Sequence, residues 1–166
     1  MKPENIALFD LDGTLCDYHT RLSEDLEKLR NPVEERYKHP VRDGSPDYIR
    51  NRADLIRSTE SWWENLPKLQ LGWDVLKVAR QLDYRTVILT QGPRRNPFSW
   101  SGKKKWVDKN LGNDADITIT RDKSQVYGRV LVDDFPSYIE GWLKWRNRGL
   151  VIMPTNEENR DFKHEQ

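Results

Sequence analysis

Short apolar runs recur along the chain and predict buried strands. They lie at residues 6–9, 86–89, 130–132 and 150–153, and a weaker run lies at 117–119. Continuous apolar runs of this length are typical of strands that helices cover on both faces, as in a parallel sheet.

Helical periodicity appears between these runs. Apolar positions that would share one helical face are Val75, Leu76, Ala79 and Leu82 in one segment, and Phe135, Tyr138, Ile139, Trp142 and Leu143 in another. Pro136 suits the first turn of the second helix, and Gly149 marks the break before the last strand. Strands that alternate with helices indicate right-handed crossovers. We therefore expect an α/β fold, a Rossmann-like doubly wound parallel sheet.

The stretch between the first strand and the helix near Gly72 is too long for a simple crossover and contains no good strand. Two amphipathic stripes and a possible capping box, Ser61-x-x-Glu64, predict short helices there. We expect residues 18–68 to form a small helical cap over the carboxyl ends of the strands. Residues 1–17 and 69–154 would form the catalytic core, and residues 155–166 a polar, loosely ordered tail.

Composition narrows the function classes. The 166 residues suit one compact domain, and 28 Lys+Arg against 27 Asp+Glu give a net charge of +1. This balance gives no general attraction to anionic membranes and leaves nucleic acid as the less favoured partner. Cys16 is the single cysteine, and no apolar run at the start suits a signal peptide or membrane span. We expect a cytoplasmic protein.

The first candidate for chemistry is the sequence FDLDGT at residues 9–14, which follows the first predicted strand. It places the carboxylates of Asp10 and Asp12 near the crevice where open α/β sheets bind ligands. Gly13 permits a tight turn after them. Taken alone, the motif would be better explained as an ordinary Asp-Gly turn.

Three further elements follow strands in the same way. Thr90 and Gln91 end the second strand before Gly92, and a hydroxyl with free backbone N–H groups can hold a phosphate oxygen. Lys123 could neutralise a transferring phosphoryl group. The pair Asp133-Asp134 comes directly after residues 130–132, where two carboxylates suit Mg²⁺. Each signal is weak alone, and the four together favour phosphoryl transfer.

In order and strand context, these four elements resemble the motifs of the haloacid dehalogenase-like phosphatases. The resemblance implies a sheet of order 3-2-1-4-5 with the nucleophile on the central first strand, and a cap inserted after that strand. The segments 119–123 and 132–134 are more closely similar to the 5′(3′)-deoxyribonucleotidases, as is the segment from Lys103 to Lys109. Gln91 departs from the family's usual Ser, and Phe135 from its usual basic residue.

The resemblance assigns roles to these residues. Asp10 would attack phosphorus and form an aspartyl-phosphate, with Asp12 as general acid and base. Mg²⁺ would be bound by Asp10, Asp134 and the Asp12 backbone carbonyl. Asp133 would either hydrogen-bond these ligands without binding the metal directly or orient Lys123. Thr90, Gln91 and Lys123 would bind the phosphoryl oxygens, with Lys103 as an outer contact.

The substrate implied is small, a deoxynucleoside or ribonucleoside monophosphate. Tyr18, Trp62 and Trp63 could converge above Asp10 as a nucleobase pocket, in which we expect one tryptophan to be exposed and the other to pack the cap onto the core. One alternative is a polynucleotide end phosphatase that uses the basic 94–105 segment and Trp100. Another is a non-catalytic phospho-acceptor on the same scaffold. The scattered histidines, His19, His39 and His164, suggest surface or cap positions.

Overall fold

The computed structural model describes residues 5–156 and 159–163. Within them, five parallel strands form one sheet of order β3-β2-β1-β4-β5. The strands are β1 (Ile6–Phe9), β2 (Arg85–Gln91), β3 (Ile117–Thr120), β4 (Val130–Val132) and β5 (Leu150–Ile152). The predicted α/β fold and strand order are confirmed.

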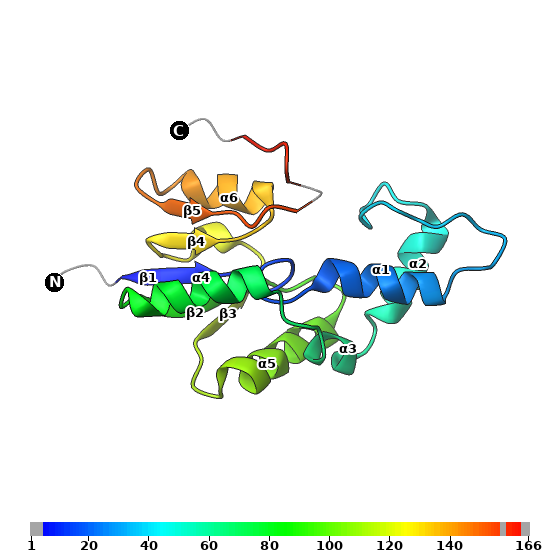
Figure 1. Ribbon diagram of the computed structural model, residues 1–166, viewed down its shortest axis with the longest axis horizontal. Helices are drawn as coiled ribbons and strands as arrows, with labels where there is room; N and C mark the ends of the chain where they lie inside the picture. The colour runs from blue at the N-terminus through cyan, green and yellow to red at the C-terminus, as the bar shows by residue number, and fades with distance from the viewer. Residues whose placement is uncertain (1–4, 157–158, 164–166) are drawn as a thin grey trace.

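Helices cover both faces of this sheet, which explains the continuous apolar runs. Alternate residues of β1 point to opposite faces: Ala7 and Phe9 belong to one buried cluster and Leu8 to another. The first cluster includes side chains of α4 (Gln70–Gln81) and α5 (Pro97–Leu111), and the second those of α6 (Pro136–Leu143). In Figure 1, α4 lies in front of the sheet and runs roughly along the strands.

The chain between β1 and α4 is helical. It contains α1 (Tyr18–Lys28), α2 (Asp47–Ile56) and α3 (Glu60–Glu64), and α1 and α2 extend beyond the carboxyl ends of the strands (Figure 1). The predicted capping box is wrong, because α3 begins at Glu60, after Thr59 rather than after Ser61, and has no side-chain cap. The division into a core and a cap stays a prediction.

Helix α3 packs closely on α5. A Cβ atom added at Gly102 would lie 2.5 Å from the Cβ atom of Trp63 and 2.7 Å from the carbonyl oxygen of Glu60. Glycine therefore allows the two helices to approach. No apolar periodicity predicts α5, since the residues that it buries include Ser99 and Lys103 beside Trp106.

The segment after β5 differs from the expected loose tail. Asn159 is 1% exposed and donates hydrogen bonds to two backbone carbonyls.

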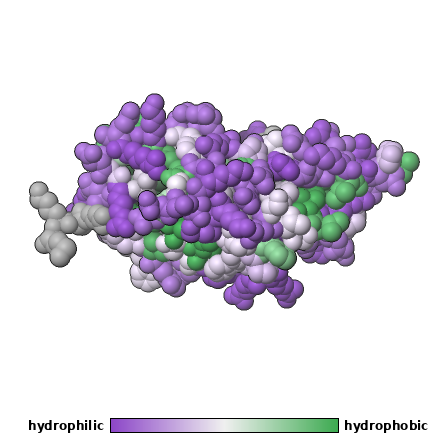
Figure 2. Space-filling model, turned by 90° about the horizontal axis from the view of Figure 1, so that it is seen from below, coloured by the Kyte–Doolittle hydropathy of each residue, from purple (hydrophilic) through white to green (hydrophobic). Residues whose placement is uncertain are grey.

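The short 3₁₀ helix η1 (Lys123–Gln125) follows β3. None of the helices in the described residues is both long and apolar enough to cross a bilayer. The face in Figure 2 is mostly hydrophilic, with apolar side chains in small patches.

Candidate active site

The predicted catalytic residues meet at the carboxyl edge of the sheet because their strands are neighbours. The backbone N–H of Asp10 donates to the carbonyl of Val132 at 2.9 Å, which aligns the ends of β1 and β4. Gly13 has a φ of 78°, and a Cβ atom there would lie 2.2 Å from Asp134 Oδ2. Glycine is thus required both by the backbone conformation and by the approach of Asp134.

Lys123 is a buried cation of this site, next to Asp10 and Asp133. Its Nζ lies 2.8 Å from Asp10 Oδ1 and 2.7 Å from Asp133 Oδ2. The same ammonium lies 4.5 Å from the ring centroid of Tyr138. Burial lowers the pKa of Lys123, but Asp10 and Asp133 raise it more, so that the net shift is upward. The lysine is therefore held as a cation against Asp10.

Lys103 is the second buried lysine of the site, next to Asp12. Its Nζ lies 2.8 Å from Asp12 Oδ2, and it donates to Thr90 Oγ1 at 3.1 Å and to the Gln91 carbonyl at 2.6 Å. Lys103 is only 3% exposed. The structure thus places Lys103 inside the site, closer than the outer contact that the sequence suggested.

The site carries more negative than positive charge when its groups are ionised. Four carboxylates, Asp10, Asp12, Asp133 and Asp134, face two lysine ammonium groups, Lys103 and Lys123. Burial raises the pKa of Asp10, and it raises that of Asp133 to about 7 although Lys123 acts in the opposite direction. The crowded carboxylates therefore need a further cation to be ionised together.

A divalent cation fits this cluster. Asp10, Asp133 and Asp134 each offer a carboxylate oxygen, and these atoms all lie within 4.8 Å of one another. Buried carboxylate oxygens are hard ligands of the kind that Mg²⁺ prefers. The cluster joins three of the four residues predicted as metal ligands, and Asp12 would contribute only its backbone carbonyl.

The three aromatic residues predicted to form a base pocket contact one another. Tyr18 stacks on Trp63 with centroids 5.8 Å apart, and Trp62 meets both rings edge-on. Both tryptophans are buried, at 7% and 3% exposure, so the expectation that one is exposed is wrong. The indole N–H of Trp62 donates to Asp25, and that of Trp63 donates to the Arg57 carbonyl. Both tryptophans can therefore be buried without leaving a polar group unpaired.

A family model described as "5′ nucleotidase, deoxy (Pyrimidine), cytosolic type C protein" matches residues 59–166 of this chain. The chain belongs to this family. The match includes the segments of Thr90, Lys103, Lys123 and the Asp133-Asp134 pair. The first strand with Asp10 lies outside it, but similar proteins match along most of the chain.

The human cytosolic-type 5′(3′)-deoxyribonucleotidase is 27% identical over 173 residues, covering 90% of this chain and 85% of the human protein. A Bordetella pertussis protein provisionally named a 5′(3′)-deoxyribonucleotidase is 27% identical over 165 residues, covering 94% and 88% respectively. A Burkholderia xenovorans protein provisionally named a haloacid dehalogenase-like hydrolase has a similar fold. Its TM-score is 0.51 at 17% identity, covering 92% of this chain and 83% of that one.

Two residues outside the predicted motifs of this deoxynucleotidase also contact the site. Asn156 Nδ2 donates to Asp134 Oδ2 at 2.8 Å, and His19 Nε2 lies 3.5 Å from the same oxygen. The sequence placed His19 at the surface or in the cap and Asn156 in a loose tail, because neither belongs to a motif. His164 lies outside the described residues.

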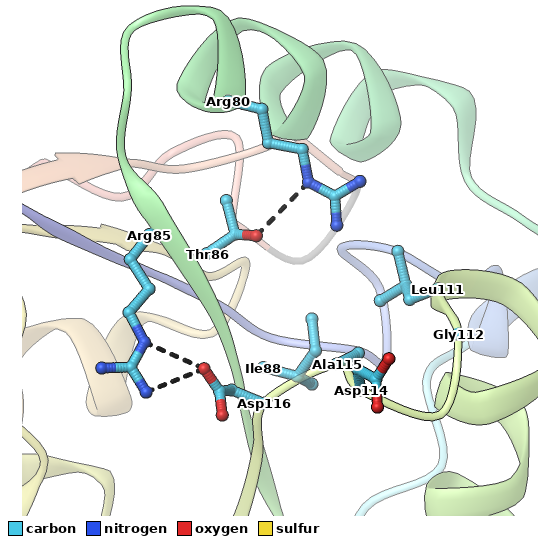
Figure 3. Close-up of a pocket in the computed structure, with 9 residues that line it drawn as sticks. All are labelled: Arg80, Arg85, Thr86, Ile88, Leu111, Gly112, Asp114, Ala115 and Asp116. Atoms are coloured by element: carbon cyan, nitrogen blue, oxygen red, sulfur yellow. Dashed lines mark hydrogen bonds and ion pairs between the residues drawn. The ribbon is translucent and has the colours of Figure 1, made fainter.

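Two pockets lie apart from the predicted catalytic residues of this nucleotidase. One, of about 360 Å³, lies at the amino ends of β2 and β3 (Figure 3), where Arg85 pairs with Asp116 and Arg80 donates to Thr86. The other, of about 560 Å³, lies between residues 37–45 and Arg160. None of the predicted site residues lines either pocket.

Proposed function

We propose that this nucleotidase hydrolyses nucleoside monophosphates, deoxyribonucleotides in preference to ribonucleotides, through an aspartyl-phosphate on Asp10. The observation that carries the proposal is the pair of lysine contacts at the sheet edge. Lys123 lies against Asp10, and Lys103 joins Asp12 to Thr90. A nucleophile, an acid/base and two phosphate-binding cations are therefore within one small site.

In the first step, an Asp10 carboxylate oxygen attacks phosphorus, and the bond from phosphorus to the nucleoside oxygen breaks. Asp12 gives its proton to that oxygen, so the nucleoside leaves as an alcohol. Lys123 and Lys103 bind the phosphoryl oxygens as charge spreads over them, with the Thr90 hydroxyl as a further donor. The products are a free nucleoside and a phosphorylated Asp10.

In the second step, Asp12 takes a proton from water, whose oxygen attacks the same phosphorus. The bond to Asp10 breaks, phosphate leaves, and the carboxylate is restored. Mg²⁺ held by Asp10 and Asp134 would neutralise charge on the transferring phosphoryl group. Asp133, at 2.7 Å from Lys123, would keep the lysine directed at Asp10.

The substrate preference rests on Tyr18 and the helical segment. Tyr18 follows the nucleophile loop, and Trp63, on which it stacks, lies 5.3 Å from the Nζ of Lys103 when measured to its ring centroid. Because the tryptophans are buried, Tyr18 is the one of the three predicted pocket residues left to contact a nucleobase. We propose that residues 18–68 act as a cap that supplies this contact.

A substrate panel with the purified protein tests the proposal. We expect the highest kcat/KM for dTMP, a lower value for UMP, and activity that EDTA removes and Mg²⁺ restores. A higher value for a 3′-phosphorylated oligonucleotide would reassign the protein to end repair, and a higher value for a sugar phosphate would remove the base contact. Full activity in EDTA would contradict the metal site.

A further inference from the structure

The segment that follows β5 returns to the candidate metal site. Asn156 Nδ2 donates to Asp134 Oδ2 at 2.8 Å. Asn159 Nδ2 donates to the backbone carbonyl of the same aspartate, also at 2.8 Å. Two side-chain amides from one short segment therefore hold both the carboxylate and the backbone of Asp134.

The two asparagines also fix each other. The backbone N–H of Asn156 donates to Asn159 Oδ1 at 2.8 Å, and the backbone N–H of Asn159 donates to Asn156 Oδ1 at 3.1 Å. Both amide oxygens are thus occupied by backbone donors, which directs both NH₂ groups toward Asp134. A second bond from Asn159 Nδ2 to the Pro154 carbonyl ties the turn to the end of β5.

The chemistry of this contact differs from that of the other carboxylates. Asp10, Asp12 and Asp133 each contact a lysine ammonium. The Asn156 amide is neutral, so it orients Asp134 Oδ2 without cancelling the negative charge. Gly13 on the neighbouring loop leaves the space that this carboxylate fills. Asp134 is thereby held in place by neutral amides, with the imidazole of His19, 3.5 Å from the same oxygen, as a further neighbour.

We infer that Asn156 and Asn159 are positioning residues that orient Asp134 toward a divalent cation, which makes the segment after β5 a part of the active site. The inference rests on the proposed function. Groups that hydrogen-bond metal ligands generally change metal affinity or activity by about 10–100-fold when they are removed. We expect an effect of this size here.

Calorimetric titration of the full chain with Mg²⁺ alone tests the inference. Asn156→Ala should raise the Kd for Mg²⁺ by about 10–100-fold. The Mg²⁺ concentration for half-maximal activity should rise similarly, while kcat at saturating Mg²⁺ stays near the wild-type value. Asn110→Ala is the matched control, because Asn110 Nδ2 also donates a 2.8 Å bond, to the Trp106 carbonyl on α5.

Asn159→Ala is the second variant, and its thermal stabilisation by Mg²⁺ should be smaller than that of wild type. If the loss of this buried amide prevents folding, Asn156→Ala decides the matter alone. A wild-type protein that binds no Mg²⁺ would refute the proposed metal site itself. Normal Mg²⁺ affinity in Asn156→Ala, with Asp134→Ala impaired, would overturn only the role of the asparagines.

Discussion

The carboxyl edge of the sheet and the helical segment 18–64 use charge in opposite ways. At the sheet edge, the side chains of Lys123 and Asp133 are 1% and 0% exposed. In the helical segment, the side chains of ion pairs are more exposed, as with Lys28 at 69% and Asp54 at 74%. The interior of that segment is apolar instead, with Leu22, Leu26 and Ile49 buried in the same cluster as Trp62 and Trp63.

This contrast separates the sheet edge, expected to serve function, from the helical segment, expected to serve stability. Surface ion pairs contribute little to folding, whereas buried ones cost desolvation energy that their attraction only partly offsets. We therefore expect the buried lysines and aspartates of the sheet edge to serve chemistry. Changes there should mainly affect turnover, and changes in the helical segment should mainly affect the free energy of unfolding.

The largest expected effect is that of Asp10→Asn. Loss of the nucleophile should lower kcat by at least about 10⁴-fold, while Lys123 keeps Asp133 as a partner and the fold survives. Steady-state assays give the rate, and circular dichroism checks the fold. Sustained turnover by the folded variant would refute the aspartyl-phosphate mechanism.

Asp12→Asn should lower kcat by about 10²–10⁴-fold, because the nucleophile remains but the proton transfers are lost. A substrate with a leaving group that needs no protonation sharpens this prediction. With p-nitrophenyl phosphate, we expect a burst of nitrophenol close to one equivalent, followed by slow turnover as the phosphorylated enzyme accumulates. Absence of a burst together with normal turnover would remove Asp12 from the mechanism.

In the helical segment, Trp63→Ala should lower the free energy of unfolding by about 3–5 kcal/mol, because it empties a buried aromatic site. Trp145→Ala is the control: Trp145 is 70% exposed, and its loss should change stability by less than about 0.5 kcal/mol. Urea denaturation measures both. Equal, small effects would mean that Trp63 does not pack the segment onto α5.

The two regions should also respond to pH with opposite sign. Burial, opposed by Lys123, raises the pKa of Asp133 from 3.8 to about 7 in the folded protein. The stability linked to this group is therefore present below pH 3.8 and lost as pH rises through about 7. Between pH 5 and 8 in EDTA, the Tm of wild type should fall more steeply than that of Asp133→Asn. A steeper fall in the variant would contradict this.

The smallest effect is expected at Asp25. Burial raises its pKa, but hydrogen bonds from Lys28, Arg21 and Trp62 lower it more, to about 2. This stability is present above the usual value of 3.8 and is lost as pH falls toward 2. In Asp25→Asn, the decline in Tm between pH 5 and 2 should be shallower than in wild type. An unchanged decline would show that these contacts contribute nothing.

The sheet could be predicted from sequence because both of its faces are covered, so that each strand is marked by an apolar run. The residues at the strand ends could be predicted because their types and order form a pattern, although Lys103 lies deeper than expected. The exposure of Trp62 and Trp63 could not, since it depends on how α3 meets α5. The contact of Asn156 with Asp134 also left no signal, because it depends on where the chain turns after β5.

The order of the strands also determines when the site can form. Asp10 directly follows the first strand of the sheet, whereas Asp134 and its asparagine partners come more than 120 residues later. Their contact requires β4 to pair with β1 and the chain to turn back after β5. Such long-range contacts form late in folding because the loop between them must close first. Binding of Mg²⁺ would therefore report that the chain has folded along its whole length, and a nascent chain that stops before Asn159 would lack a complete site.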